Sequence, residues 1–135
     1  MGPCADVSPV EIGRLSCYSS RGFVDGEFVK PDLVAPGQVY YASRASADGS
    51  DASETTDRSG RYRPFNGTSA ATPYVAGIVA LMLQRRPELT TGQIRERLHG
   101  CLSHDEFTGT LPNSSWGHGK LDFAAVERLL AGLRK

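Results

Sequence analysis

The sequence lacks an excess of charge, a long apolar run and a recognisable targeting segment. Its 15 Lys and Arg residues balance 15 Asp and Glu residues over 135 positions. Nucleic-acid binders, and modules that attach to membranes through basic residues, need a positive surplus, so the composition argues against both classes. No apolar run reaches the roughly 18 residues of a membrane span. The N-terminus has no basic region followed by an apolar run, so no signal peptide is visible and the localisation stays open.

Cysteine is also scarce. The three cysteines, Cys4, Cys17 and Cys101, are widely spaced and include no C-x-x-C pair. Neither a metal centre nor a disulfide framework follows from this spacing. Apolar residues make up 39% of the chain, which is enough for a core and argues against wholesale disorder. The length predicts one domain at most.

The first part of the chain has the pattern of short strands and turns. Residues 7–20 are rich in β-branched and small residues and predict a strand followed by a turn. An Asp25-Gly26 pair lies between two short apolar pairs. This arrangement is typical of a tight hairpin, because glycine readily adopts the backbone angles of the turn.

Two further strands and a loop follow the hairpin. Residues 33–35 predict a brief buried strand that stops at a Pro-Gly pair, and residues 39–42 predict another strand. Residues 44–63 are polar and contain few apolar side chains. This composition predicts an exposed and mobile loop.

The composition changes at residues 69–84, where nearly every side chain is small or apolar. The length of this segment favours a helix over a strand. Since apolar residues surround the whole circumference, we expect the helix to be buried on every side. Pro73 lies near the start of the segment, and the first turn of a helix tolerates proline.

Two shorter helices are predicted towards the C-terminus. Thr90 and Gln93 have the spacing of a capping box, which opens a helix that extends to about residue 102. Asp122 has the position of an N-cap for a helix over residues 123–133, in which apolar residues recur at helical spacing.

Ser69 is the residue with the strongest chemical signal. It is predicted to lie at the start of the long apolar helix, directly after Asn66-Gly67-Thr68. A hydroxyl group there meets unpaired backbone N–H groups and the positive end of the helix dipole, and the same donors can stabilise a developing oxyanion. Gly67 allows another chain to approach the backbone closely. The alternative is an ordinary N-cap hydroxyl, which is far commoner than a nucleophile.

Four segments together resemble the subtilisin-like (S8) serine proteases. GTSAATP at residues 67–73, followed by VAG, is similar to the serine motif G-T-S-x-A-x-P of that family. Residues 25–37, DGEFVKPDLVAPG, resemble its K-P-D-x-x-A-P-G segment. Residues 16–22, SCYSSRG, resemble its A-x-F-S-x-x-G strand. Residues 116–126, WGHGKLDFAAV, resemble its closing turn and C-terminal helix.

The resemblance implies an α/β fold, the C-terminal part of a subtilisin-like arrangement of sheet and helices, with a buried central helix that starts near Ser69. It implies hydrolysis of protein or peptide substrates, with Ser69 as the catalytic nucleophile. Gly67 and Thr68 would border the substrate-binding cleft, and the Ser69 N–H would donate to the oxyanion.

The aspartate motif D-[ST]-G and the histidine motif H-G-T-x-V-A-G of the family are absent from the sequence, as is the segment with the oxyanion asparagine. Residues 1–135 therefore resemble the serine-bearing C-terminal portion of a catalytic domain. We expect this chain alone to be inactive, because without a base the serine hydroxyl stays protonated and weakly nucleophilic.

The other candidate residues have simpler interpretations. His99 is expected near the end of a helix, before a glycine cap at Gly100. His104 and Asp105 are expected in a solvated turn, and His118 lies between two glycines of the closing turn. None of the three histidines is expected to replace the missing base.

Asp32 belongs to the K-P-D segment, and we expect it to have a structural role. The acidic residues Asp48, Asp51, Glu54 and Asp57 offer oxygen ligands that suit Ca²⁺, and several members of the family bind calcium. Their spacing lacks the D-x-[DN]-x-[DN]-G pattern, so a solvated loop is favoured. We therefore expect no metal site and no cofactor.

Two functions from different classes remain open. The first is a serine-type endopeptidase portion that works with the missing N-terminal half of the domain. The second is a non-catalytic subtilisin-like homologue that acts as an interaction or assembly module. Either way, the all-apolar helix needs cover, so we expect self-association or a complex with the missing half.

Overall fold

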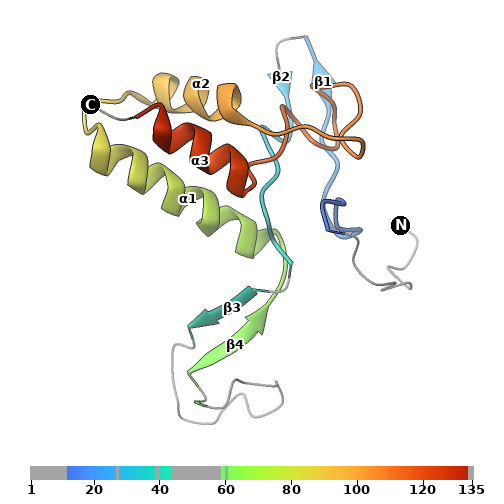
Figure 1. Cartoon of the computed structure of the whole chain (residues 1–135). Helices are drawn as coiled ribbons and strands as arrows, with labels where there is room; N and C mark the ends of the chain where they lie inside the picture. Colours follow the sequence, from blue (N-terminus) through green and yellow to red (C-terminus); the bar gives the residue numbers. More distant parts are fainter. Residues whose placement is uncertain (1–11, 27, 39, 44–58, 60, 134–135) are drawn as a thin grey trace.

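The computed structural model describes residues 12–26, 28–38, 40–43, 59 and 61–133 (Figure 1). Strands and turns occupy the first part of the described chain, and three helices follow. The elements are β1 Val24–Asp25, β2 Phe28–Val29, β3 Tyr40–Ser43, β4 Tyr62–Phe65, α1 Thr68–Arg85, α2 Thr91–Cys101 and α3 Phe123–Ala131.

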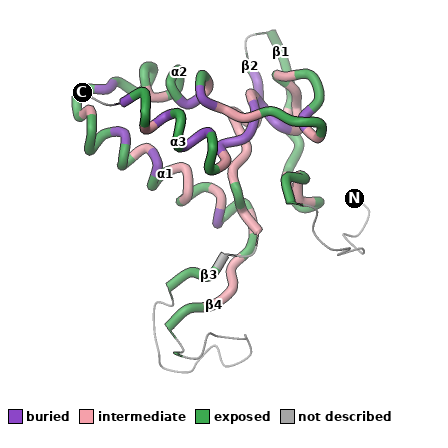
Figure 2. The backbone as a smooth tube through the Cα atoms, viewed as in Figure 1, coloured by how far each residue is buried: buried purple, intermediate pink, exposed green. Residues whose placement is uncertain are grey.

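The hydrophobic core lies between the three helices, where their buried faces meet (Figure 2). Met82 of α1 has almost no exposed surface. The same holds for Leu121 and Leu133, which lie just before and just after α3. Burying a large aliphatic side chain contributes about 1.5–3 kcal/mol, so these contacts are the main stabilisation of the described part of the chain. Leu98 of α2 and Leu129 of α3 close the same core.

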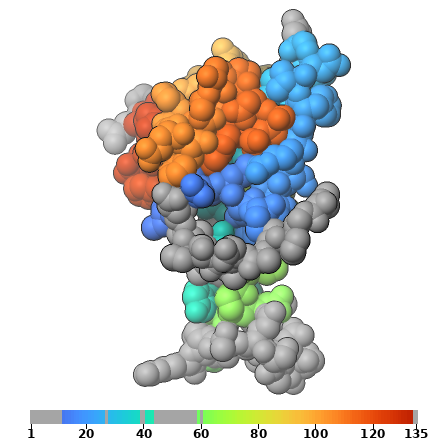
Figure 3. Space-filling model, turned by 90° about the vertical axis from the view of Figure 1, so that its right-hand side faces the viewer, coloured from blue at the N-terminus to red at the C-terminus, as the bar shows by residue number. Residues whose placement is uncertain are grey.

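The Asp25-Gly26 hairpin is confirmed. Strands β1 and β2 pair antiparallel, with Asp25 opposite Phe28, and Gly26 has a positive φ of 56°. A second antiparallel pair joins β3 to β4, with Tyr40 opposite Phe65. This β3–β4 ribbon extends away from the helical body, beyond the N-terminal end of α1 (Figures 1 and 3).

Some predicted strands are absent or displaced. Of the predicted segment 7–20, residues 7–11 lie outside the described part, and residues 12–20 contain turns and no strand. The buried strand expected at residues 33–35 is reduced to an isolated parallel bridge between Val34 and Lys120. A strand needs a neighbouring strand with which it forms a series of backbone hydrogen bonds. Among the described residues, only a short segment around Lys120 pairs with Val34. The loop expected at 44–63 gives way to β4 at Tyr62, and residues 44–58 lie outside the described part.

Helix α1 matches the predicted range, but its burial differs from the prediction. Ala70, Ile78 and Met82 are buried, whereas Leu81 is 42% and Leu83 37% exposed. The core covers one face of α1, and no described residue covers the opposite face. Pro73 is the sixth residue of the helix rather than part of its first turn.

The two shorter helices begin at their predicted caps. The Thr90 hydroxyl accepts a hydrogen bond from the Gln93 N–H, and the Gln93 side chain accepts from the Thr90 N–H, which completes the capping box. The Asp122 carboxylate accepts from the Ala125 N–H at 2.8 Å. The expected glycine cap is wrong, because Gly100 lies inside α2 and Leu102 is the C-cap.

No helix in the described part of the chain is long and apolar enough to cross a membrane. Cys101 is a free, buried thiol, and Cys17 is disulfide-bonded, which the cysteine spacing did not indicate.

Candidate active site

The backbone turn at Gly67 brings Ser69 to the start of α1. The chain leaves β4 at Phe65 and reaches Gly67, the N-cap, whose φ of 123° is strained for any residue with a Cβ. The Gly67 carbonyl accepts hydrogen bonds from the N–H groups of Ala70 at 2.9 Å and Ala71 at 3.3 Å. These bonds start the first helical turn immediately after the glycine.

Ser69 is the second residue of α1, and its side chain is exposed. The predicted placement at a helix N-terminus is therefore confirmed. No side chain caps this end of the helix, and no acidic residue lies in its first turn. Within the described residues, the Ser69 N–H donates to no acceptor. The hydroxyl thus lies at the positive end of the dipole, beside an unused donor.

The residues on either side of Ser69 hold its backbone and leave its hydroxyl open. Ala70, directly after Ser69, is buried. The Thr72 hydroxyl donates to the Thr68 carbonyl at 3.0 Å. Pro73 has no N–H to donate to the Ser69 carbonyl four residues earlier. Gly67 is half-buried and Thr68 is exposed, so the two residues proposed to border a cleft directly precede Ser69 at the accessible end of α1.

The histidines form a separate cluster. All three, His99, His104 and His118, lie in the described part of the chain, and none is hydrogen-bonded to Ser69. The rings of His99 and His118 stack with their centroids 4.1 Å apart and an interplanar angle of 20°. His104 is exposed. The structure therefore brings together two of the three histidines, but not with the serine.

Asp32 organises the surroundings of the stacked pair. Its carboxylate forms ion pairs with Lys30 and, at 2.7 Å, with Arg95 of α2, and it lies 4.0 Å from Nε2 of His99. The Asp32 carbonyl accepts a hydrogen bond from the His118 N–H at 3.0 Å. Asp32 thus joins the K-P-D segment, α2 and the closing turn, as expected for a structural residue.

Charge and burial act in opposite directions on the pKa of Asp32. Burial raises the pKa of this carboxyl, but the hydrogen bond from Lys30 and the positive charges of Arg95 and Lys30 outweigh it and hold the pKa below 3.8. The pKa of His99 lies below 6.5, because burial, His118 and Arg95 disfavour the imidazolium more than Asp32 favours it. His99 Nε2 is buried and has no hydrogen-bond partner.

The turn at His104 and Asp105 is solvent-exposed, as predicted, and Asp105 is also ion-paired. The buried ammonium of Lys120 donates to the Asp105 carboxylate at 2.6 Å and lies 4.6 Å from the centre of the Trp116 ring. The hydrogen bond from Lys120 is the main cause that lowers the pKa of Asp105. Sequence reasoning missed this pair because Asp105 and Lys120 are 15 residues apart, with no helical or strand periodicity to relate them.

The acidic residues Asp48, Asp51, Glu54 and Asp57 lie outside the described residues. Among the described residues, no group of three His, Cys, Asp or Glu side chains could hold a metal ion.

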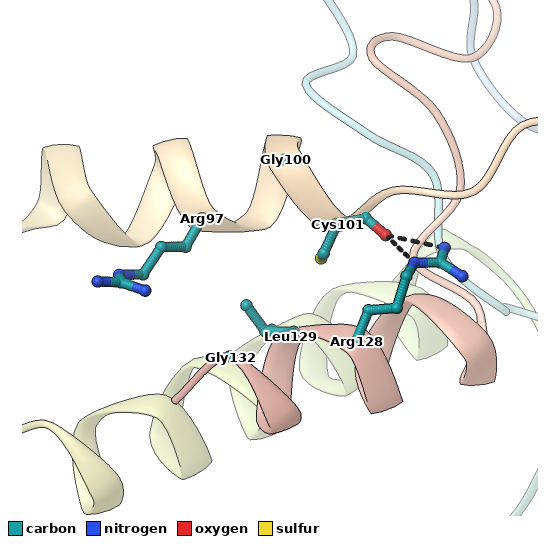
Figure 4. Close-up of a pocket in the computed structure, with 6 residues that line it drawn as sticks. All are labelled: Arg97, Gly100, Cys101, Arg128, Leu129 and Gly132. Carbon is teal, nitrogen blue, oxygen red and sulfur yellow. Dashed lines mark hydrogen bonds between the residues drawn. The ribbon is translucent and has the colours of Figure 1, made fainter. Parts of the chain in front are cut away.

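A shallow cleft of about 250 Å³ opens between α2 and α3, and Ser69 is not among the residues that line it (Figure 4). Arg128 is already engaged there, because its guanidinium donates to the Cys101 carbonyl at 3.0 Å and so closes the end of α2. The thiol of Cys101 donates to the Leu98 carbonyl at 3.1 Å, and burial raises its pKa. The cleft therefore offers no activated nucleophile. Its lining residues are Arg97, Gly100, Cys101, Arg128, Leu129 and Gly132.

A sequence model of the subtilase family matches residues 9–119, a range that includes the Ser69 turn and the Asp32 cluster. The chain belongs to the subtilase family. The resemblance seen in the four sequence segments is thereby confirmed, and the helices with small sheets agree with the expected α/β fold.

Individual relatives agree with this assignment. The chain is 37% identical over 118 residues to subtilisin of Bacillus pumilus, which covers 87% of the chain and 36% of the relative. It is 39% identical over 85 residues to serine protease AprX of Bacillus subtilis (strain 168), covering 62% of the chain and 19% of the relative. The CspB protease of Clostridium perfringens has a similar structure, with a TM-score of 0.65 and 30% identity over 90% of this chain and 25% of that one. The chain thus spans about a third or less of the length of these relatives.

Proposed function

We propose that this chain is the nucleophile-bearing portion of a subtilisin-like serine endopeptidase. Ser69 is the attacking residue, and Gly67 and Thr68 border the bound peptide. The observation that carries the proposal is the exposed hydroxyl at the second residue of α1, beside an unused N–H at an uncapped helix end. The family membership and the relatives that are proteases support it.

The chemistry is acyl transfer to serine followed by hydrolysis. Ser69 Oγ bonds to the carbonyl carbon of the scissile peptide, and its proton passes to a histidine. The Ser69 N–H donates to the oxyanion that forms. Collapse of this intermediate breaks the C–N bond, and the proton moves to the leaving amine. Water then attacks the acyl ester and releases Ser69.

The histidine that takes the proton comes from outside these 135 residues. His99 and His118 are stacked against each other beside Asp32, and His104 is exposed and has no hydrogen bond to Ser69. A further polypeptide segment with the aspartate, the histidine and an oxyanion asparagine would complete the site. In subtilisin itself, loss of triad residues lowers kcat by about 10⁶-fold, a value measured for that relative and not for this chain.

The test is complementation in solution. The full chain is mixed with a separately expressed segment of Bacillus pumilus subtilisin, namely the part that precedes the region matched by this chain. We expect a serine-reactive phosphonate to label Ser69 rapidly in the mixture and slowly or not at all in the chain alone. Ser69→Ala should abolish the labelling and peptide hydrolysis, whereas Ser20→Ala, at an exposed serine, should leave both unchanged.

Labelling that persists in the Ser69→Ala variant would overturn the role of Ser69. Rapid labelling of the chain alone would show that a base is present within it. A stable complex with the subtilisin segment that neither labels nor hydrolyses peptides favours the second candidate, a non-catalytic assembly module. The uncovered apolar face of α1 is the observation that keeps this second candidate open.

A further inference from the structure

One carbonyl oxygen connects the turn before Ser69 to a part of the chain 30 residues earlier. The Gly67 N–H, two residues before Ser69, donates to the Gly37 carbonyl at 2.7 Å. The same oxygen accepts a longer hydrogen bond, 3.2 Å, from the hydroxyl of Tyr18. A carbonyl oxygen has two lone pairs and can accept both.

The backbone at Gly37 also packs directly on the start of α1. A Cβ at this position would lie 2.8 Å from the Gly67 carbonyl oxygen and 3.2 Å from the Cβ of Ala71. Both distances are shorter than ordinary van der Waals contact, so any larger residue would push the Gly67 turn away. A glycine can be required either for a left-handed backbone conformation or for close packing. The φ of Gly37 is not in the left-handed region, so close packing is the reason here.

The turn at Gly37 is itself held from outside. The Ser16 hydroxyl donates to the side-chain oxygen of Gln38 at 2.9 Å, next to the bond from Tyr18. Ser16 and Tyr18 therefore each donate a hydrogen bond to one residue of this turn, Gln38 and Gly37 respectively. Tyr18 stands where the pattern A-x-F-S-x-x-G, which residues 16–22 resemble, has phenylalanine.

We propose that Gly37 and Tyr18 are positioning residues for Ser69. Gly37 provides the surface and the acceptor on which the Gly67 turn rests, and Tyr18 holds that acceptor in place. Together they fix the direction of the first N–H groups of α1 relative to the Ser69 side chain. The inference rests on the proposed role of Ser69, but it concerns local geometry that can be measured without catalysis.

A thiol in place of the Ser69 hydroxyl reports on this geometry. In the full-length Ser69→Cys variant, alkylation by iodoacetamide is followed against pH by mass spectrometry of the peptide that contains position 69. The native cysteines fall in other peptides. An ordinary thiol has a pKa of about 8.5, and a helix N-terminus lowers this value because it stabilises the thiolate. We expect the pKa of this thiol to lie below 8.5.

Two second substitutions are made in the Ser69→Cys background. Gly37→Ala should raise the pKa of the thiol and lower its thiolate fraction at pH 7 by up to about fivefold, the upper range of a surface helix-dipole effect, so that its alkylation slows. Adding Ala71→Gly, which removes the contact at 3.2 Å, should restore part of the rate. Tyr18→Phe removes one oxygen and adds no atom, and should slow alkylation by about twofold.

Matched controls separate positioning from general effects. Gly77→Ala makes the same change in α1, at a glycine with open space around its Cβ position. Tyr41→Phe removes a hydroxyl from an exposed tyrosine of β3. Both controls should leave the pKa of the thiol and the rate unchanged.

The proposal is overturned if folded Gly37→Ala and Tyr18→Phe variants have the thiol pKa and rate of the Ser69→Cys parent. If Gly37→Ala does not fold, as judged by circular dichroism, Tyr18→Phe decides alone. The readout needs neither a histidine nor a partner chain. If Gly37→Ala and Tyr18→Phe shift the thiol pKa but the complementation test gives no hydrolysis, the positioning roles are retained and the proposed function is rejected. If the thiol pKa does not shift but the mixture hydrolyses peptides, the proposed function is retained and the positioning roles are rejected.

Discussion

At the scale of single residues, His99 has the least favourable environment for a charge. Its Nε2 atom is buried without a hydrogen-bond partner, and its ring stacks on His118. The side chain of Arg95, on the same helix, adds a positive charge nearby, and only Asp32 at 4.0 Å opposes it. The folded protein therefore keeps His99 neutral at a pH where the unfolded chain already binds a proton.

This difference predicts a loss of stability in mild acid. The pKa of His99 in the folded state is below the ordinary 6.5, so its contribution is fully present above pH 6.5. As the pH falls below 6.5, the unfolded state gains a proton first, and stability decreases until the folded pKa is passed. His99→Phe keeps the ring stack and removes the titration. We expect its free energy of unfolding in urea to depend less on pH between 7.5 and 5 than that of the parent.

His104→Phe is the control, because His104 is exposed. It should retain the pH dependence of the parent. Equal slopes for the parent and His99→Phe would show that His99 is not the group responsible.

At the scale of elements, the start of α2 depends on local sequence. The Thr90 hydroxyl is an N-cap, and both bonds of the capping box are present, whereas Thr91 is the first helical residue and is exposed. Thr90→Ala leaves the Gln93 N–H without its acceptor. We expect it to lower the free energy of unfolding by about 1 kcal/mol, measured by urea denaturation.

Thr91→Ala makes the same chemical change one residue later and removes no cap. It should change the stability by less than about 0.5 kcal/mol. Equal losses in the two variants would contradict the capping role of Thr90 and would indicate a general requirement for threonine in this turn.

At the scale of the whole molecule, α1 has an uncovered apolar face. Ala76, Ala80 and Leu83 recur at positions i, i+4 and i+7 along this face, and all three are exposed, Leu83 by 37%. Covering each 100 Å² of apolar surface contributes about 2.5 kcal/mol. We expect the chain to form a dimer or higher oligomer at micromolar concentration, or to bind the rest of a subtilisin-like domain, and light scattering or sedimentation measures this.

Ala80→Lys places a charge on the uncovered face and should shift the chain toward monomer. Ala124→Lys makes the same change at an exposed position of α3 and should leave the association unchanged. A compact monomer at micromolar concentration that binds no apolar dye would show that this argument is wrong and that the chain is stable with the face open.

Features that depend on neighbouring residues could be predicted from the sequence alone. The capping box at Thr90, the N-cap at Asp122, the Asp25-Gly26 hairpin and the extent of α1 are set by bonds that span a few residues. The placement of Ser69 belongs to this group, since the glycine before it and the apolar run after it define where the helix begins. The four motifs and their order along the chain likewise indicate the subtilase family, because each motif is a short stretch of neighbouring residues.

Only the tertiary structure decided which distant groups meet. It placed His99 against His118 and Asp32, paired Asp105 with the buried Lys120, and rested the Gly67 turn on Gly37. It also buries only one face of α1, although the composition of this helix predicts burial on every side. These contacts join residues that are 15 or more positions apart in the printed sequence. Their energy comes from close packing and paired charges, which depend on how the chain returns on itself and leave no periodic signal in the sequence.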